Sequence, residues 1–137
     1  MECRAKYTIC NIPVIYEDNY LLVLDKPSGL LTIPTPKKES HTLTSILNAQ
    51  AQKNGSSYRL HPCHRLDRET SGLIIYALGK SVQRKMADEF RKRKIKKTYL
   101  AFIERVPSKS EAQIIIPIEG MSAITKYKII EKTFYSK

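Results

Sequence analysis

The chain has 137 residues, of which 42% are hydrophobic and 27% charged, a composition typical of a single soluble domain with its own core. No apolar run approaches the ~20 residues of a membrane-spanning helix, and residues 1–6 lack the apolar core of a signal peptide. We therefore expect a cytoplasmic protein outside the membrane, with its three cysteines reduced. A net charge of +11 favours a polyanionic partner, nucleic acid before membrane. A charge that only keeps the surface soluble is the alternative.

The first third of the chain predicts a β-hairpin followed by a loop. Two β-favouring runs, residues 12–16 and 20–24, flank the turn-type residues Glu17-Asp18-Asn19. The second run is apolar without alternation, which predicts a strand buried on both faces. Residues 25–29, with the sequence DKPSG, then break the strand, because Pro removes a hydrogen-bond donor and Gly permits positive φ.

Two helices are expected further along the chain. Thr42 can cap a helix that runs to Lys53 and ends at Asn54-Gly55. Ser81 is the predicted cap of a second helix over 82–93. The apolar residues of both segments recur at helical spacing, which predicts core contacts rather than a cofactor site. They are Leu43, Ile46, Leu47 and Ala51 in the first helix and Val82, Met86 and Phe90 in the second.

A run of six cations in seven residues, RKRKIKK at 91–97, follows the second helix. The helix dipole accounts for one or two cations at a helix C-terminus. Six exceed that need, so we expect this run to contact phosphate. Further strands are predicted at 73–78, 98–103, 112–116 and 123–130. Together the elements predict an α+β fold, with a mixed, mostly antiparallel sheet and helices packed on it.

The most concentrated chemistry lies in residues 61–72, HPCHRLDRETSG, just before the predicted strand 73–78. Nearby cations favour the charged form of the Asp67 carboxylate, which could then be a nucleophile, a base or the anchor of an arginine. The ordinary interpretation of an isolated R-x-D triplet is a surface ion pair. Zinc binding by His61, Cys63 and His64 is disfavoured, because no second ligand pair has matching spacing. A serine triad and a nucleotide-binding glycine loop have no supporting pattern either.

Residues 64–77, HRLDRETSGLIIYA, resemble the signature of the RluA-type pseudouridine synthases, H-R-L-D-x-x-T-S-G followed by an apolar strand. Three further stretches resemble other motifs of this family, in the family's order. They are residues 14–18 with 24–30, residues 90–91 with 96–101, and residues 123–127. Four co-linear motifs, covering about Ile12 to Ile130, are far more specific than one short pattern.

The resemblance implies an RNA pseudouridine synthase, an isomerase that converts uridine to pseudouridine in rRNA or tRNA without cofactor or metal. Residues 1–137 would form one catalytic domain of this type, lacking its C-terminal part. Asp67 would be the catalytic carboxylate, attacking either C1′ of the ribose or C6 of the base. Tyr99 would stack on the flipped uracil and assist proton transfer. RNA-binding residues would be His64, Arg65, Arg91, Arg93, Lys96 and Lys97.

The chain departs from the family pattern after the A-x-T-x-Y stretch. Family members continue to a third motif, roughly G-R-T-H-Q-I/L-R, which supplies a basic partner for the aspartate, and residues 128–137 contain no such sequence. A catalytically inactive RNA-binding remnant is therefore the main alternative to an active enzyme, and a basic structural protein is a weaker one. We also expect an exposed sheet edge, which would permit a homodimer.

Overall fold

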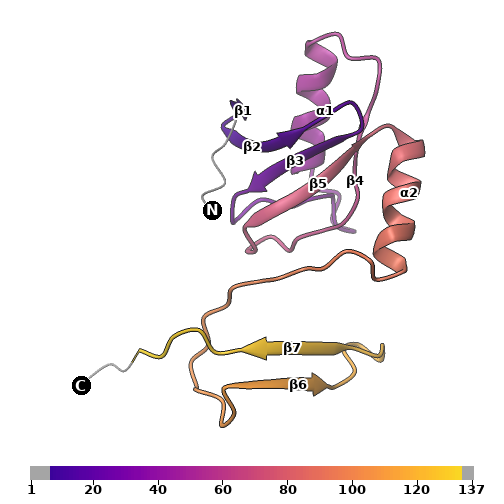
Figure 1. The fold of residues 1–137 in the computed structure, drawn as a ribbon. Helices are drawn as coiled ribbons and strands as arrows, with labels where there is room; N and C mark the ends of the chain where they lie inside the picture. Colours follow the sequence, from indigo (N-terminus) through magenta and orange to yellow (C-terminus); the bar gives the residue numbers. More distant parts are fainter. Residues whose placement is uncertain (1–6, 134–137) are drawn as a thin grey trace. The chain divides into compact units, whose positions relative to one another are not determined.

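The computed structural model describes residues 7–133, which fall into two compact units that meet in the chain at Lys96 and Lys97. The first unit contains a five-stranded sheet and both helices, and the second contains a two-stranded sheet (Figure 1). Every strand pair among the described residues is antiparallel. The predicted α+β class is confirmed. The assignment of residues 1–137 to one catalytic domain stays a prediction.

The sheet of the first unit has the strand order β1-β2-β3-β5-β4. Its strands are β1 (Tyr7–Ile9), β2 (Ile12–Glu17), β3 (Leu21–Lys26), β4 (Leu60–Pro62) and β5 (Gly72–Leu78). The predicted hairpin and the strand after the HRLD motif are therefore both present. The two outer strands, β1 and β4, were not predicted, because a strand of three residues carries too little periodicity to detect.

The turn between β2 and β3 is built around Asp18. Its Oδ1 accepts hydrogen bonds from the amides of Tyr20 and Leu21 at 2.8 and 2.7 Å, and its Oδ2 accepts from the Tyr16 hydroxyl at 2.7 Å. These donors hold the pKa of the Asp18 carboxyl below its ordinary value. The prediction that β3 is buried on both faces was wrong. Leu22 and Leu24 enter the core, whereas Leu21 and Val23 on the other face are only half-buried.

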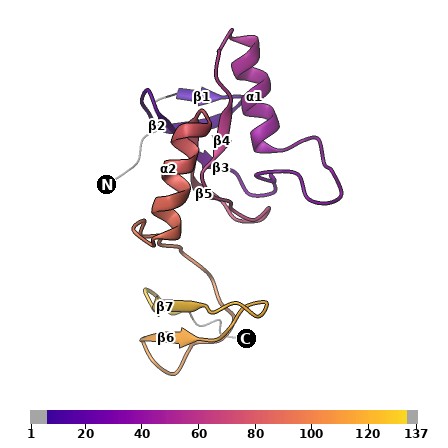
Figure 2. The ribbon, with the colours of Figure 1, turned by 90° about the vertical axis from the view of Figure 1, so that its right-hand side faces the viewer.

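Helix α1 (Leu43–Lys53) begins and ends where the sequence predicts, with a capping box between Thr42 and Ser45. Its buried side chains, Leu43 and Leu47, join the apolar residues of the sheet in one core cluster. Helix α2 (Lys80–Arg91) lies along β5 and β4 (Figure 2). It begins earlier than predicted, with Gly79 rather than Ser81 at the N-cap. Gly79 has a φ of 101°, so the chain can turn from β5 directly into the helix.

The second unit is a hairpin of β6 (Glu111–Ile115) and β7 (Ile124–Lys128). The predicted strand over 98–103 is not formed. Backbone groups form a strand only where a partner strand accepts them, and these residues pair with no other described segment. Phe102 accordingly remains 99% exposed. Within residues 7–133, no helix is long and apolar enough to cross a bilayer.

Candidate active site

The signature motif forms an irregular loop, residues 63–71, that joins the antiparallel strands β4 and β5. The amide of Cys63 still donates to the Ile75 carbonyl at 2.8 Å, so the loop leaves the sheet in register. Leu66 is buried in the core and anchors the middle of the loop. Arg65 and Asp67, on either side of Leu66, are exposed. The core residue therefore fixes the loop while its polar neighbours face solvent.

Two segments distant in sequence hold the backbone of this loop on both sides of Asp67. On the N-terminal side, the buried Thr32 hydroxyl donates to the Leu66 carbonyl at 2.8 Å and accepts from the Leu66 amide at 3.3 Å. On the C-terminal side, the Gly29 amide donates to the Arg68 carbonyl at 2.8 Å. The Ser28 hydroxyl donates to the next carbonyl, that of Glu69, also at 2.8 Å. We call the bonds from Thr32 and from residues 26–29 the loop clamp.

Lys26 is the centre of the loop clamp. Its side chain is fully buried, and its ammonium donates to the carbonyls of Pro27, Leu30 and Arg68 at 2.9, 2.7 and 3.1 Å. Burial lowers the pKa of Lys26, and the negative charges of Glu69 and Asp67 oppose that shift. The ammonium thus ties the DKPSG turn to the loop and places a fixed positive charge near Asp67.

The Asp67 carboxylate is exposed and is not neutralised by a neighbouring arginine. Among residues 7–133 it makes no ion pair, and the neighbouring Arg68 lies instead beside Glu39, with a nitrogen–oxygen distance of 3.8 Å. The ordinary interpretation, a surface pair between Asp67 and a neighbouring arginine, is therefore not what the structure contains. An exposed carboxylate on a loop held by its neighbours' backbone is a suitable arrangement for a nucleophile or base.

His64 belongs to the loop and packs against helix α2. Its Nε2 accepts a hydrogen bond from the Ile75 amide at 3.2 Å, and its ring centroid is 5.0 Å from that of Phe90. These contacts give His64 a structural role, and its binding to RNA stays a prediction. Because Phe90 directly precedes Arg91, the same contact brings the start of the basic run beside the loop.

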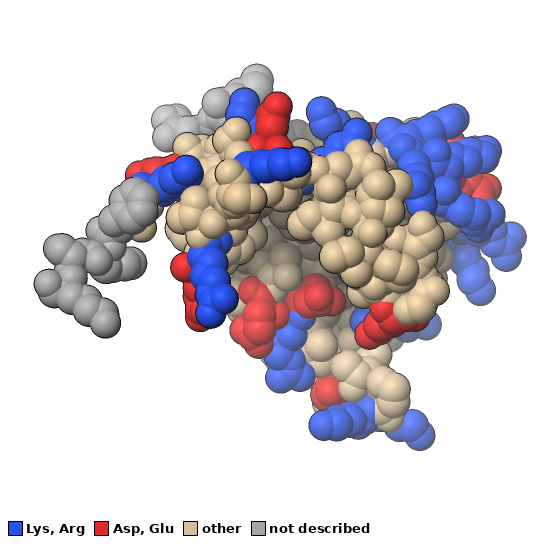
Figure 3. Space-filling view, turned by 90° about the horizontal axis from the view of Figure 1, so that it is seen from below, with Lys and Arg blue, Asp and Glu red and all other residues tan. Residues whose placement is uncertain are grey.

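The basic run is exposed, and parts of it are engaged in ion pairs. Arg91 pairs with Asp88 at 3.0 Å and Lys94 with Glu89 at 3.3 Å. Arg93 and Lys96 are exposed, and Arg93 turns the chain after α2 with a φ of 54°. In Figure 3 Lys and Arg side chains are densest on one side of the face shown and are also present elsewhere on it. The charge predicted to contact phosphate is thus present on the surface, although two acidic side chains reduce it.

Lys97 and Tyr99 belong to the second unit. Tyr99 is 58% exposed and lies in the irregular segment before β6. Their predicted roles, RNA binding and stacking on the flipped base, therefore rest on the motif alone.

The zinc ligands considered in the sequence do not form a cluster. Within the described part of the chain, no group of three His, Cys, Asp or Glu side chains is placed to hold a metal ion. Burial raises the pKa of the Cys63 thiol to about 11, which keeps it protonated near neutral pH.

Sequence reasoning missed Lys26 and Thr32 as residues that support the site. The DKPSG stretch was interpreted only as a strand break and a family motif. A lysine at the end of an apolar strand is ordinarily exposed, so the local sequence contains no signal that the Lys26 ammonium is buried. The acceptor on Arg68, 42 residues away, could not be found from local pattern.

Comparison with known proteins identifies the class to which this loop and fold belong. The family model described as RNA pseudouridylate synthase matches residues 20–136, and the chain belongs to this family. A solved structure, the human RNA pseudouridylate synthase domain containing 4, shares the fold with a TM-score of 0.59 and 22% identity. That match covers 87% of this chain and 48% of the human one.

Among individual proteins, the chain is similar to the dual-specificity RNA pseudouridine synthases RluA of two bacteria. It is 32% identical to the Yersinia pestis protein, covering 87% of this chain and 63% of the relative. It is 30% identical to the Haemophilus influenzae protein, covering 88% and 60%. The uncharacterized RNA pseudouridine synthase YhcT of Bacillus subtilis is 27% identical over 87% of this chain and 44% of its own length. The chain therefore spans less than two thirds of these relatives.

Proposed function

We propose that this chain isomerises uridine to pseudouridine in rRNA or tRNA, with Asp67 as the catalytic carboxylate. The observation that carries the proposal is the Asp67 loop, exposed at its carboxylate and fixed by the loop clamp on both sides. In the reaction the N1–C1′ glycosidic bond breaks and a C5–C1′ bond forms. C5 loses a proton and N1 carries one in the product, so atoms and electrons balance without a cofactor.

The chain's residues would divide the work as follows. Asp67 attacks C1′ of the ribose or C6 of the base, and the fixed loop holds its carboxylate for that attack. Because a base inside a stem is inaccessible, the uridine has to leave the stack. Arg65 then binds RNA near the vacated position, and Tyr99 receives the flipped base on its ring. Arg91, Arg93, Lys96 and Lys97 bind the phosphate backbone, together with His64.

The test is conversion of uridine in bulk rRNA and tRNA, read as pseudouridine by mass spectrometry of the digested RNA. The intact chain is expected to form pseudouridine, and Asp67→Asn, which removes the charge at constant size, is expected to abolish it. Glu69→Gln is the matched control, since it removes a neighbouring carboxylate while the Glu69 carbonyl still accepts from Ser28. Conversion that survives Asp67→Asn would remove Asp67 from the catalytic role.

A second candidate function is RNA binding without conversion. The observation in its favour is the exposed basic run, including Arg93 and Lys96, which can bind phosphate whether or not Asp67 reacts. RNA binding with a steep salt dependence but no pseudouridine from the intact chain would select this function. Binding that is absent or insensitive to salt would exclude both candidates and favour a basic structural protein.

A further inference from the structure

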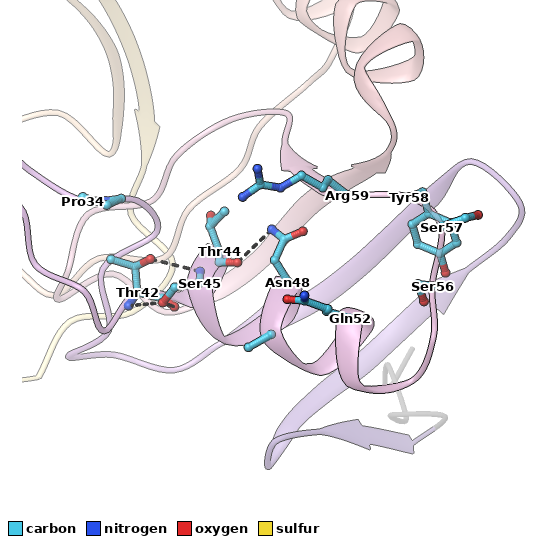
Figure 4. A pocket seen from close by; sticks show the side chains of 11 residues that line it. Pro34, Thr42, Thr44, Ser45, Asn48, Gln52, Ser56, Ser57, Tyr58 and Arg59 are labelled. Atoms are coloured by element: carbon cyan, nitrogen blue, oxygen red, sulfur yellow. Dashed lines mark hydrogen bonds between the residues drawn. The ribbon is translucent and has the colours of Figure 1, made fainter.

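A groove of about 760 Å³ runs along helix α1 in the first unit. Its floor comes from α1 and its cap, and its opposite wall is the segment 56–59 that leads into β4 (Figure 4). This volume lies within the range of about 300–1,000 Å³ usual for sites of small molecules. None of the residues that line it is acidic, and Arg59 adds a positive charge. The charge of the groove therefore suits an anionic ligand.

The floor of the groove is fixed by hydrogen bonds within the protein. Asn48 donates to the Leu60 carbonyl and accepts from the Leu60 amide, both at 2.9 Å. The Thr44 hydroxyl bonds to the Tyr76 hydroxyl at 2.9 Å, and Thr42 and Ser45 form the helix cap. These side chains shape the groove but have little capacity left for a ligand. The site would thus be preorganised.

The rim differs from the floor, because its side chains are uncommitted. Within residues 7–133, the side chains of Gln52, Ser57, Tyr58 and Arg59 make no hydrogen bond or ion pair with another residue. Tyr58 is 41% exposed, so part of its ring faces solvent. In Figure 4 the Arg59 side chain extends away from Tyr58 toward the part of the groove lined by Thr44. An aromatic face, a guanidinium and neutral donors are the groups that bind an unpaired nucleotide.

The groove is connected to the Asp67 loop through Thr32. The Thr44 hydroxyl in the groove donates to the Thr32 carbonyl at 2.7 Å, and the Thr32 hydroxyl donates to the Leu66 carbonyl at 2.8 Å. Two hydrogen bonds therefore separate the floor of the groove from the residue before Asp67. A ligand in the groove would lie against the same element that holds the candidate catalytic loop.

Positive charge continues from Arg59 to the start of α2. The Gly79 amide, at the N-cap of α2, donates to the Arg59 carbonyl at 3.0 Å. The first turn of α2 contains no acidic residue and begins with Lys80. A cation at a helix N-terminus is unfavourable, because the positive end of the helix dipole lies there. The pKa of His61 is lowered by burial first and then by the charges of Arg59 and Lys80. A phosphate would relieve this concentration of like charges.

We propose that the α1 groove binds an unpaired nucleotide of the RNA substrate, with its base on Tyr58 and its phosphate on Arg59. The proposal rests on the proposed function for the identity of the ligand, and assigns a second RNA contact to the same unit that carries Asp67. Lys80, next along the path of positive charge, would receive an adjacent phosphate. The groove would thereby fix the position of RNA flanking the target uridine.

The test measures equilibrium binding of the full chain to a labelled single-stranded oligoribonucleotide of about 12 nucleotides by fluorescence anisotropy at several salt concentrations. Tyr58→Ala is expected to weaken binding about fivefold or more, and Tyr58→Phe to leave it unchanged. Arg59→Ala is expected to reduce the slope of log affinity against log salt by about 0.7, the value for one phosphate on a single strand. Matched controls are Tyr20→Ala and Lys109→Ala, exposed residues outside the groove.

RNA affinity is measured independently of uridine conversion. The groove proposal and the isomerase proposal can therefore be refuted separately. Loss of affinity in Tyr58→Ala without pseudouridine from the intact chain supports the groove and refutes the isomerase. Pseudouridine formation with Tyr58→Ala and Arg59→Ala binding like their controls overturns the groove proposal and leaves the isomerase. In that second case the groove would be a candidate site for a protein segment and not for RNA. Circular dichroism of each variant verifies that the fold is retained.

Discussion

The buried ammonium of Lys26 offers the sharpest test of how the candidate site is held. Lys26→Met keeps the length and the apolar stem of the side chain but removes its three donors. The carbonyls of Pro27 and Leu30 lose a bond each, and that of Arg68 keeps only the Gly29 amide. The substitution therefore loosens the DKPSG turn and the C-terminal side of the Asp67 loop together.

The expected loss of stability in Lys26→Met follows from the number of hydrogen bonds that the ammonium makes. Hydrogen bonds to a charged group are worth about 1.5–3 kcal/mol each, so three amount to roughly 4.5–9 kcal/mol. Removing the buried ion also removes its desolvation cost, which is several kcal/mol. We expect a net loss of about 2–4 kcal/mol in the free energy of unfolding. Hydrogen exchange should accelerate at the Thr70 amide, which donates to the Asp67 carbonyl, and at the Gly29 amide, which donates to the Arg68 carbonyl, because both bonds lie in the loosened segments.

The assay is urea unfolding monitored by circular dichroism, combined with amide hydrogen exchange of the folded chain. Lys37→Met is the control, because Lys37 is an exposed lysine in the loop before α1. A destabilisation by Lys26→Met below about 0.5 kcal/mol, equal to the effect of an ordinary surface substitution, would refute the reasoning. So would exchange that accelerates uniformly along the chain, since the loop would then have no special dependence on Lys26.

Three further predictions follow from the same contacts. Thr32→Val should destabilise the fold by about 1–3 kcal/mol in urea unfolding, because the Leu66 amide and carbonyl lose a buried partner; an unchanged midpoint would contradict this. Since the pKa of His61 is lowered in the folded state, stability should fall as pH decreases from about 6.5 toward the folded pKa and level off below it. A His61→Gln chain should lack that component in unfolding measured against pH, whereas an identical profile would exclude His61 as its source. Cys63 should react with iodoacetamide much more slowly at pH 8 than the exposed Cys10, because burial raises the pKa of the Cys63 thiol to about 11. Peptide mass spectrometry measures the two rates, and equal rates would show that the loop opens readily.

The sequence predicted the elements whose signals are local. Thr42 and Asn54 delimit α1 as expected, because a helix cap is a property of neighbouring residues. The segment 98–103 has high β propensity but needs a partner strand, and propensity contains no information about partners. The identity of Asp67 as the candidate residue came from the ordered motifs. The hydrogen bonds that hold the Asp67 loop could not be predicted from the sequence. Lys26 bonds to a residue 42 positions away and Thr32 to one 34 positions away, beyond the reach of any local pattern.

The loop clamp binds the backbone on both sides of Asp67 but not its side chain. The carboxylate can consequently be exchanged for an amide without loss of any hydrogen bond that supports the loop. The exchange removes one of the two negative charges that favour the charged form of Lys26, and that of Glu69 is retained. Under the proposed function, an Asp67→Asn chain should therefore bind RNA with the affinity of the parental chain and form no pseudouridine. RNA recovered on such a chain from a cell extract, where no product forms, would identify the RNA that the protein binds.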